Sequence, residues 1–136
     1  MFVLNSTLEN DSIPLMETDL CLVRLINDAR YPWVLVVPKI PDVSELHELS
    51  DAEYAEVMKT ARVLGGILKD SFDADKINTA VIGNMVSQLH VHIVARRQDD
   101  AAWPSPIWGV GDMEPLSDKE CAHRLETIRV GIGDQI

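Results

Sequence analysis

Polar and apolar residues alternate through the segment Gln-Leu-His-Val-His-Ile-Val-Ala at positions 88–95, and this pattern constrains the fold more than any other part of the chain. Successive side chains of a β-strand point to opposite faces of the sheet, so such a segment has two different faces. One face carries the apolar row, which should pack against a helix. The other presents Gln88, His90 and His92, followed by Val94. We therefore predict a strand over residues 88–95 that displays two histidines side by side.

Three further segments have the branched apolar content of strands. Two of them, residues 19–26 and 33–37, are separated by a connector rich in turn residues and should form a hairpin. The third, residues 77–83, shortly precedes the histidine segment. Together these segments predict an antiparallel sheet.

Two helices are expected beside this sheet. After a capping sequence that starts at Ser50, apolar residues recur at helical spacing, which predicts a helix over residues 51–69. The pair Gly65-Gly66 marks either a close approach or an early end of that helix, because glycine is unfavourable in a helix interior. A second capping box at Ser117 predicts a C-terminal helix over residues 117–130.

The composition bounds the class of partner. The chain has 136 residues, enough for one domain spanning residues 1–136, and its formal net charge is −10. Such a charge repels a long phosphate backbone, so duplex nucleic acid is not an expected partner, whereas a small phosphorylated ligand can still find donors locally. No basic leader precedes an apolar core, and no apolar run approaches the ~18 residues of a membrane helix. We expect a cytoplasmic location and no membrane partner.

The two histidines are the strongest candidates for chemistry. Residues two apart on a strand stand ~6.6 Å apart along its axis, close enough to address one phosphate or one metal ion. The ordinary pKa of a histidine side chain lies near neutral pH, which suits such a residue to acid–base and nucleophilic chemistry. A zinc or iron site at His90 and His92 therefore stays open, although its third ligand would have to come from elsewhere in the fold. The candidates are Cys21, His47, Cys121 and His123.

The segment Gln88-Leu-His-Val-His-Ile-Val94 resembles the motif of the histidine-triad family, His-φ-His-φ-His-φ-φ with φ apolar, except that Gln88 stands at the first histidine. The resemblance extends to Trp-Val-Leu-Val-Val-Pro-Lys at positions 33–39 and to Leu-His-Glu-Leu-Ser-Asp-Ala-Glu at positions 46–53, and covers about residues 20–97. It implies an α+β fold of the histidine-triad type. This fold has an antiparallel sheet of about five strands, one long helix packed on the sheet and a C-terminal helix, the loop and helix being residues 98–136. It also implies a homodimer.

The resemblance assigns roles position by position. His90 falls on the nucleophile, which attacks the α-phosphorus of a nucleotide and becomes a covalent phosphohistidine, and His92 falls on the histidine that holds the phosphate. Asn27 falls where the family contacts the ribose, and Asn84 where loop residues contact phosphate. The implied function is a nucleotide-phosphate hydrolase or nucleotidyl transferase that acts on a small nucleotide or nucleotide conjugate and requires no cofactor and no metal.

Other features leave alternatives open. Gln88 can donate a hydrogen bond to phosphate but cannot carry a proton to a leaving group, so a catalytically weak or silent nucleotide-binding protein is the alternative. Residues 98–115 are rich in Pro, Gly and Trp and should form a long ordered loop. Within it, Trp103 is a candidate for stacking on a base, whereas for Trp108 we favour local packing. Arg97, directly after the histidine segment, is a candidate for attracting phosphate.

Overall fold

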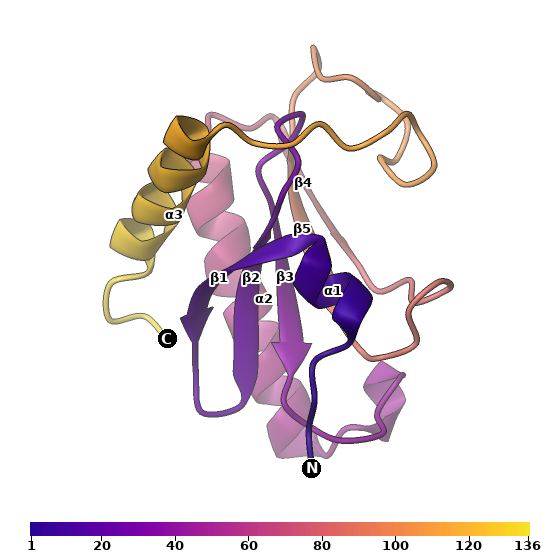
Figure 1. The fold of residues 1–136 in the computed structure, drawn as a ribbon. Helices are drawn as coiled ribbons and strands as arrows, with labels where there is room; N and C mark the ends of the chain where they lie inside the picture. Colours follow the sequence, from indigo (N-terminus) through magenta and orange to yellow (C-terminus); the bar gives the residue numbers. More distant parts are fainter.

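A five-stranded antiparallel sheet lies at the centre of the computed structural model, which describes residues 1–136. In chain order the strands are β1 (Ser12–Glu17), β2 (Cys21–Ile26), β3 (Trp33–Pro38), β4 (Lys76–Ala80) and β5 (Val91–Arg96). Their order across the sheet is β1-β2-β3-β5-β4 (Figure 1). The strand with the histidine segment, β5, therefore lies between two neighbours, and the hairpin of β2 and β3 is confirmed.

Two helices cover one face of this sheet (Figure 1). α2 (Asp51–Ser71) starts at a capping box in which the Ser50 hydroxyl accepts from the Glu53 N–H, and α3 (Asp118–Ile132) starts at the cap Ser117. α2 continues through Gly65-Gly66, so the alternative of an early helix end is wrong. The close approach lies elsewhere: a Cβ on Gly131 of α3 would lie 2.7 Å from Ile67 of α2. None of the helices is both long and apolar enough to cross a membrane.

The two faces of β5 contact different parts of the fold, as the alternation of the sequence predicts. Val91, Ile93 and Ala95 are buried in the core between the sheet and α2. Val94 belongs to a second apolar cluster on the opposite face. That face is covered by the short helix α1 (Ser6–Asn10) and by the loop between β5 and α3. A 3₁₀ turn, Leu46–Glu48, precedes α2.

The α+β architecture is confirmed, but some of the predicted boundaries are wrong. β5 begins at Val91 rather than Gln88, because its pairing with β3 ends at Val91 and with β4 at His92. Before that point the chain makes other contacts, such as the Leu89 N–H to the Val43 carbonyl at 2.9 Å. β4 therefore ends at Ala80 instead of continuing to residue 83, since the residues beyond it have no strand to pair with.

One buried arginine joins α3 to the turn between β2 and β3. Nη1 of Arg124 donates to the carbonyls of Asp28 at 2.9 Å and Tyr31 at 2.8 Å, and Nη2 donates to that of Ala29 at 2.9 Å. Nε is paired with Glu120 at 3.0 Å. Because β3 starts directly after this turn, Arg124 helps to fix where the central strands begin.

Candidate functional site

His90 and His92 lie together on the sheet face opposite α2. Their ring centroids are 4.8 Å apart, with the planes tilted by 70°. Both are almost covered, with exposed fractions of 6% for His90 and 7% for His92. His90 precedes β5 and His92 is its second residue, so the backbone stays extended enough to keep the two rings side by side.

The backbone determines which nitrogen of His90 carries the proton. Nδ1 of His90 lies 2.7 Å from the carbonyl oxygen of Gln88. A carbonyl can only accept a hydrogen bond, so the proton must be on Nδ1. In the neutral ring this leaves a free lone pair on Nε2, which is the arrangement that a nucleophilic imidazole needs.

Trp33 determines the opposite arrangement in His92. The indole Nε1–H of Trp33 lies 3.1 Å from Nδ1 of His92. An indole nitrogen only donates, so Nδ1 of His92 must accept and its Nε2 must carry the proton. Trp33 is the first residue of β3, on the same sheet face as His92. The pair therefore offers one lone pair from His90 and one N–H donor from His92.

The surroundings of His92 keep the ring neutral. Burial, and secondarily the neighbouring His90, lowers the pKa of His92 from its usual 6.5 to about 3. A second ring proton would also point at the N–H of Trp33, which cannot accept it. Across the physiological range His92 is therefore a neutral donor.

This lowered pKa predicts a pH-dependent stability. The unfolded chain takes up a proton on His92 below about pH 6.5 and the folded chain only near pH 3, so stability is full above the unfolded pKa and falls as the pH drops between these values. The contribution is up to ~1.4 kcal/mol per pH unit. Urea unfolding from pH 7 to 4 should show this extra slope in the wild type and not in His92→Gln. Equal slopes in the two proteins would contradict the prediction.

Trp108 lies against the histidine pair, from the loop that follows β5. Its ring is 5.1 Å from that of His92 and 6.4 Å from that of Trp33, edge to face in both cases. Trp108 is packed against the apolar cluster around Trp33, as the prediction of local packing requires, and this packing places it beside the histidines. Nothing in the loop sequence distinguishes the tryptophan that reaches the histidines from the one that does not.

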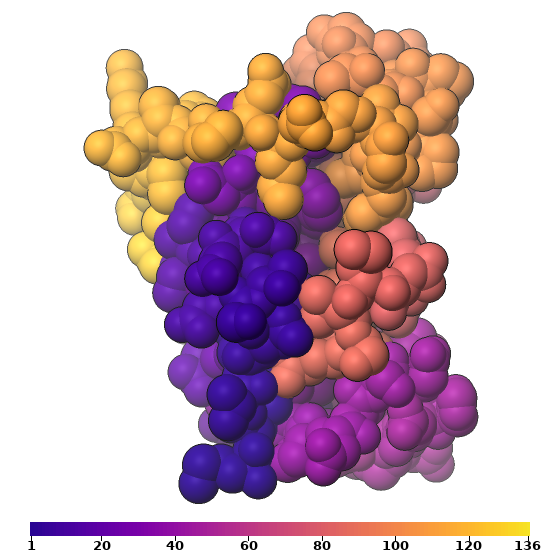
Figure 2. Space-filling view, turned by 45° about the vertical axis from the view of Figure 1, so that its right-hand side comes forward, coloured from indigo at the N-terminus to yellow at the C-terminus, as the bar shows by residue number.

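Gln88 directs its side chain away from the histidine pair. One N–H of its amide donates to the Val3 carbonyl at 2.8 Å, and its Oε1 accepts from the Asn5 N–H at 2.8 Å. The hydrogen bond that we expected it to offer to phosphate is thus made, in this structure, to the N-terminal segment. Figure 2 shows this segment, in indigo, directly against the loop before β5.

The two candidate asparagines lie in different loops. Asn27 directly follows β2, and its Oδ1 accepts from the Leu116 N–H at 2.9 Å, so it ties the end of the long loop to the sheet. Asn84 is exposed in the bend between β4 and β5, next to Gly83 with φ 69°. Their contacts to ribose and phosphate stay predictions.

Arg97 and Trp103 lie at the other end of β5. Arg97 follows His92 by five positions, which is about 16 Å along an extended chain. The Arg97 side chain is exposed and pairs with Asp99 at 3.1 Å. Trp103 packs beneath Arg96, whose guanidinium carbon is 5.5 Å from the ring centroid. The structure thus brings Trp33 and Trp108, rather than this pair, to the histidines.

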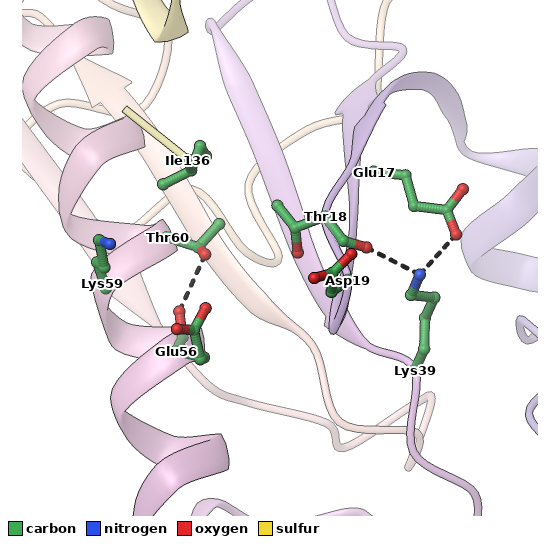
Figure 3. Close-up of a pocket in the computed structure, with 8 residues that line it drawn as sticks. All are labelled: Glu17, Thr18, Asp19, Lys39, Glu56, Lys59, Thr60 and Ile136. Carbon is green, nitrogen blue, oxygen red and sulfur yellow. Dashed lines mark hydrogen bonds and ion pairs between the residues drawn. The ribbon is translucent and has the colours of Figure 1, made fainter. Parts of the chain in front are cut away.

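A separate hollow of about 730 Å³ opens between α2 and the β1–β2 turn (Figure 3). It mixes acidic and basic side chains, and its Lys39 is already held by Glu17 at 2.6 Å and by the Thr18 carbonyl at 2.8 Å. None of the predicted site residues lines it. The histidine pair, with its defined donor and acceptor, remains the better candidate site.

The metal alternative finds no further ligand in the fold. No group of three or more His, Cys, Asp and Glu side chains is arranged to hold a metal ion. Cys21 is buried and Cys121 half-buried, and both are free thiols. A metal at this site would therefore have only His90 and His92 as protein ligands.

Comparisons with known proteins place this chain in a family. A model of the HIT domain matches residues 7–99. A solved histidine-triad protein from Sinorhizobium meliloti 1021 is 39% identical, with a TM-score of 0.93 and 96% of each chain covered. Another, from Bradyrhizobium japonicum, is 40% identical, with a TM-score of 0.94 and coverage of 96% of this chain and 98% of that one.

A third structure, of a histidine-triad protein from Marinobacter aquaeolei VT8, is 34% identical with a TM-score of 0.96, and the match covers 100% of this chain and 99% of that one. A search of curated proteins gives no match. The family model spans well over half of the chain, and the solved relatives match it over nearly their whole length. The chain therefore belongs to the histidine-triad family.

Proposed function

We propose that this protein is a nucleotide-phosphate hydrolase or nucleotidyl transferase that acts at an α-phosphate through a covalent phosphohistidine on His90. The observation that carries the proposal is the complementary protonation of the histidine pair. His90 is held with Nε2 unprotonated by the Gln88 carbonyl, and His92 with Nε2 protonated by the Trp33 indole. One ring can attack phosphorus while the other donates to a phosphate oxygen.

In the first step the Nε2 lone pair of His90 forms a bond to the α-phosphorus. The bond from phosphorus to the leaving group breaks, and the leaving group departs with that electron pair. The ring now carries Nδ1–H and a phosphorylated Nε2, and the Gln88 carbonyl that accepts from Nδ1–H at 2.7 Å stabilises its positive charge. The neutral N–H of His92 stabilises negative charge on the phosphoryl oxygens.

In the second step water or another acceptor attacks the same phosphorus. The phosphorus–Nε2 bond breaks, its electrons return to His90, and the proton of the attacking group is released to solvent. Water as acceptor gives a nucleoside monophosphate, and a second phosphorylated compound gives nucleotidyl transfer. The scheme requires no cofactor.

The site favours leaving groups that depart without taking up a proton. His92 is neutral at pH 7 because its pKa is lowered to about 3, so it carries no acidic proton at that pH. Apart from His90, the proposed nucleophile, the groups packed against it are the indoles of Trp33 and Trp108, which are not acids either. The amide of Gln88 cannot transfer a proton. We therefore expect a phosphate-type leaving group, as in a dinucleoside polyphosphate, to be preferred over an amine.

A substrate panel tests this function. Purified protein is assayed with a dinucleoside polyphosphate, a nucleotidyl ester and a purine nucleoside phosphoramidate, and kcat/KM should be highest for the polyphosphate. In Gln88→His the ratio of phosphoramidate to polyphosphate turnover should rise, because an imidazole can supply a proton to the amine. The ratio is the readout, since loss of the amide's bonds to the N-terminal segment acts on both substrates.

The same panel separates the two alternatives. Nucleotide binding by calorimetry without turnover of any substrate would support a silent binding module. Stoichiometric zinc or iron that survives dialysis and is lost in the double variant His90→Ala/His92→Ala would support the metal site. If the protein turns over no substrate in the panel and also binds no nucleotide, the proposed function is overturned.

A further inference from the structure

We propose that the side chain of Gln88 makes the N-terminal segment, residues 1–5, a positioning element for the imidazole of His90. The catalytic meaning of this inference rests on the proposed function, whereas its structural part can be measured without turnover. It gives Gln88 a role that does not depend on proton transfer: one residue holds the segment with its side chain and the nucleophile with its backbone.

The anchor is a two-point contact with backbone groups. An extended chain presents the carbonyl of one residue and the N–H of the residue two further on along the same edge. Gln88 binds such a pair: Nε2 donates to the Val3 carbonyl and Oε1 accepts from the Asn5 N–H, both at 2.8 Å. The side-chain amide thus takes the place of a peptide group in a neighbouring strand.

The same residue holds the nucleophilic ring. The Gln88 carbonyl accepts from Nδ1 of His90 at 2.7 Å, and this contact determines the tautomer. No strand pairing fixes that carbonyl, since β5 begins at Val91. The peptide after Gln88 is held through its N–H, which donates to the Val43 carbonyl at 2.9 Å. The side-chain anchor supplies the second constraint on the orientation of the carbonyl.

The N-terminal segment is itself tied to the sheet. Phe2 and Leu4 pack against the apolar cluster that contains Leu8 and Trp33. The Asn5 side chain accepts from the Thr7 N–H at 2.8 Å and so caps α1. The anchor therefore connects Gln88 to a segment with fixed attachments.

Packing alone does not press the segment onto Gln88. A polar hollow of about 430 Å³ lies directly beside the contact, with Val3, Asn5, Ser44, Ser87 and Gln88 among its lining residues. Beside this hollow, the two hydrogen bonds of the Gln88 side-chain amide connect the N-terminal segment to the loop before β5. Removing them should release both the segment and the orientation of the carbonyl that holds His90.

The test removes the anchor from each side. Gln88→Ala deletes the amide and leaves the carbonyl of residue 88 in the chain. Asn5→Pro removes the N–H that Gln88 accepts, at a φ of −57° that proline adopts without strain. Because Asn5→Pro also loses the α1 cap, Asn5→Ala is its matched control: it loses the cap and keeps the N–H. Gln98→Ala, at an exposed glutamine, controls for the loss of an amide.

Three measurements are made on each protein. Amide hydrogen exchange of residue 5 should accelerate in Gln88→Ala relative to the wild type and to Asn5→Ala. Nitrogen-15 shifts of the His90 ring should change from the single Nδ1–H form to a mixture of tautomers in Gln88→Ala and Asn5→Pro, and not in either control. In the same two variants kcat should fall about tenfold, the effect of one hydrogen bond, with a smaller change in KM.

The contact between Gln88 and the N-terminal segment can be tested even if the proposed function is wrong. If the wild type turns over no nucleotide, the exchange and nitrogen-15 measurements still decide the anchor. A single Nδ1–H tautomer of His90 in both Gln88→Ala and Asn5→Pro would overturn the inference, whether or not exchange accelerates. Unchanged exchange at residue 5 in Gln88→Ala would overturn the anchor itself.

Discussion

His90→Ala is expected to abolish covalent labelling and to reduce kcat/KM by about four orders of magnitude or more. The variant removes the only ring in the pair whose Nε2 is free to form a bond to phosphorus. His92 cannot replace it, because its Nε2 carries a proton and its Nδ1 is occupied by Trp33. The fold should survive, since the only hydrogen bond lost is the one to the Gln88 carbonyl.

The measurement is a rapid quench in alkaline denaturant with an α-phosphate-labelled substrate. Wild-type protein should retain label that is stable to base and lost in acid, as expected for a phosphohistidine. His123→Ala, which removes an exposed histidine of α3, serves as the control and should label like the wild type. Persistent labelling of His90→Ala would place the nucleophile on another residue.

Arg124→Ala should have the largest effect on stability, a loss of about 3–5 kcal/mol in the free energy of unfolding. Arg124 is 5% exposed, and its guanidinium donates to three backbone carbonyls of one turn. Without it those carbonyls lose their partner in a place that water reaches poorly, and α3 loses its link to the start of β3. Arg124→Lys should be intermediate, because one ammonium group cannot reproduce the planar set of donors.

Urea denaturation with a global fit gives the comparison. Arg62→Ala removes an exposed arginine of α2 and should change the free energy of unfolding by less than about 0.5 kcal/mol. A similar small loss in Arg124→Ala would show that the turn holds its shape without the arginine. Activity of the folded fraction of Arg124→Ala should change less than its stability, since Arg124 does not touch the histidines.

The central strands and both long helices could be predicted because their signals are local. Branched apolar runs marked β2, β3 and β5, and capping serines marked the starts of α2 and α3. β1 and α1 were not located. β1 is an edge strand with a bulge between Pro14 and Met16, which disturbs its alternation, and α1 has only five residues.

The histidine pair could be predicted because alternation holds wherever the backbone is extended, even at His90, which lies outside the ladder. The contacts around the histidine pair could not be predicted from the sequence. Gln88 and Asn5 are 83 residues apart, and neither carries a pattern that indicates the other. Conversely, closeness in sequence does not ensure closeness in space. Arg97 and Trp103 are near the motif in sequence but lie beyond the end of β5 that is farther from the histidines.

The origin of the groups around the histidine pair has a consequence for protein engineering. The two histidine rings belong to the middle of the sheet, whereas Trp108 and the N-terminal segment belong to stretches nearer the two ends of the chain. Segments from other members of the family could therefore be grafted at either end without rewriting β3 or β5. Chimeras of this kind would change the groups around the two histidines while every version keeps the same histidine pair.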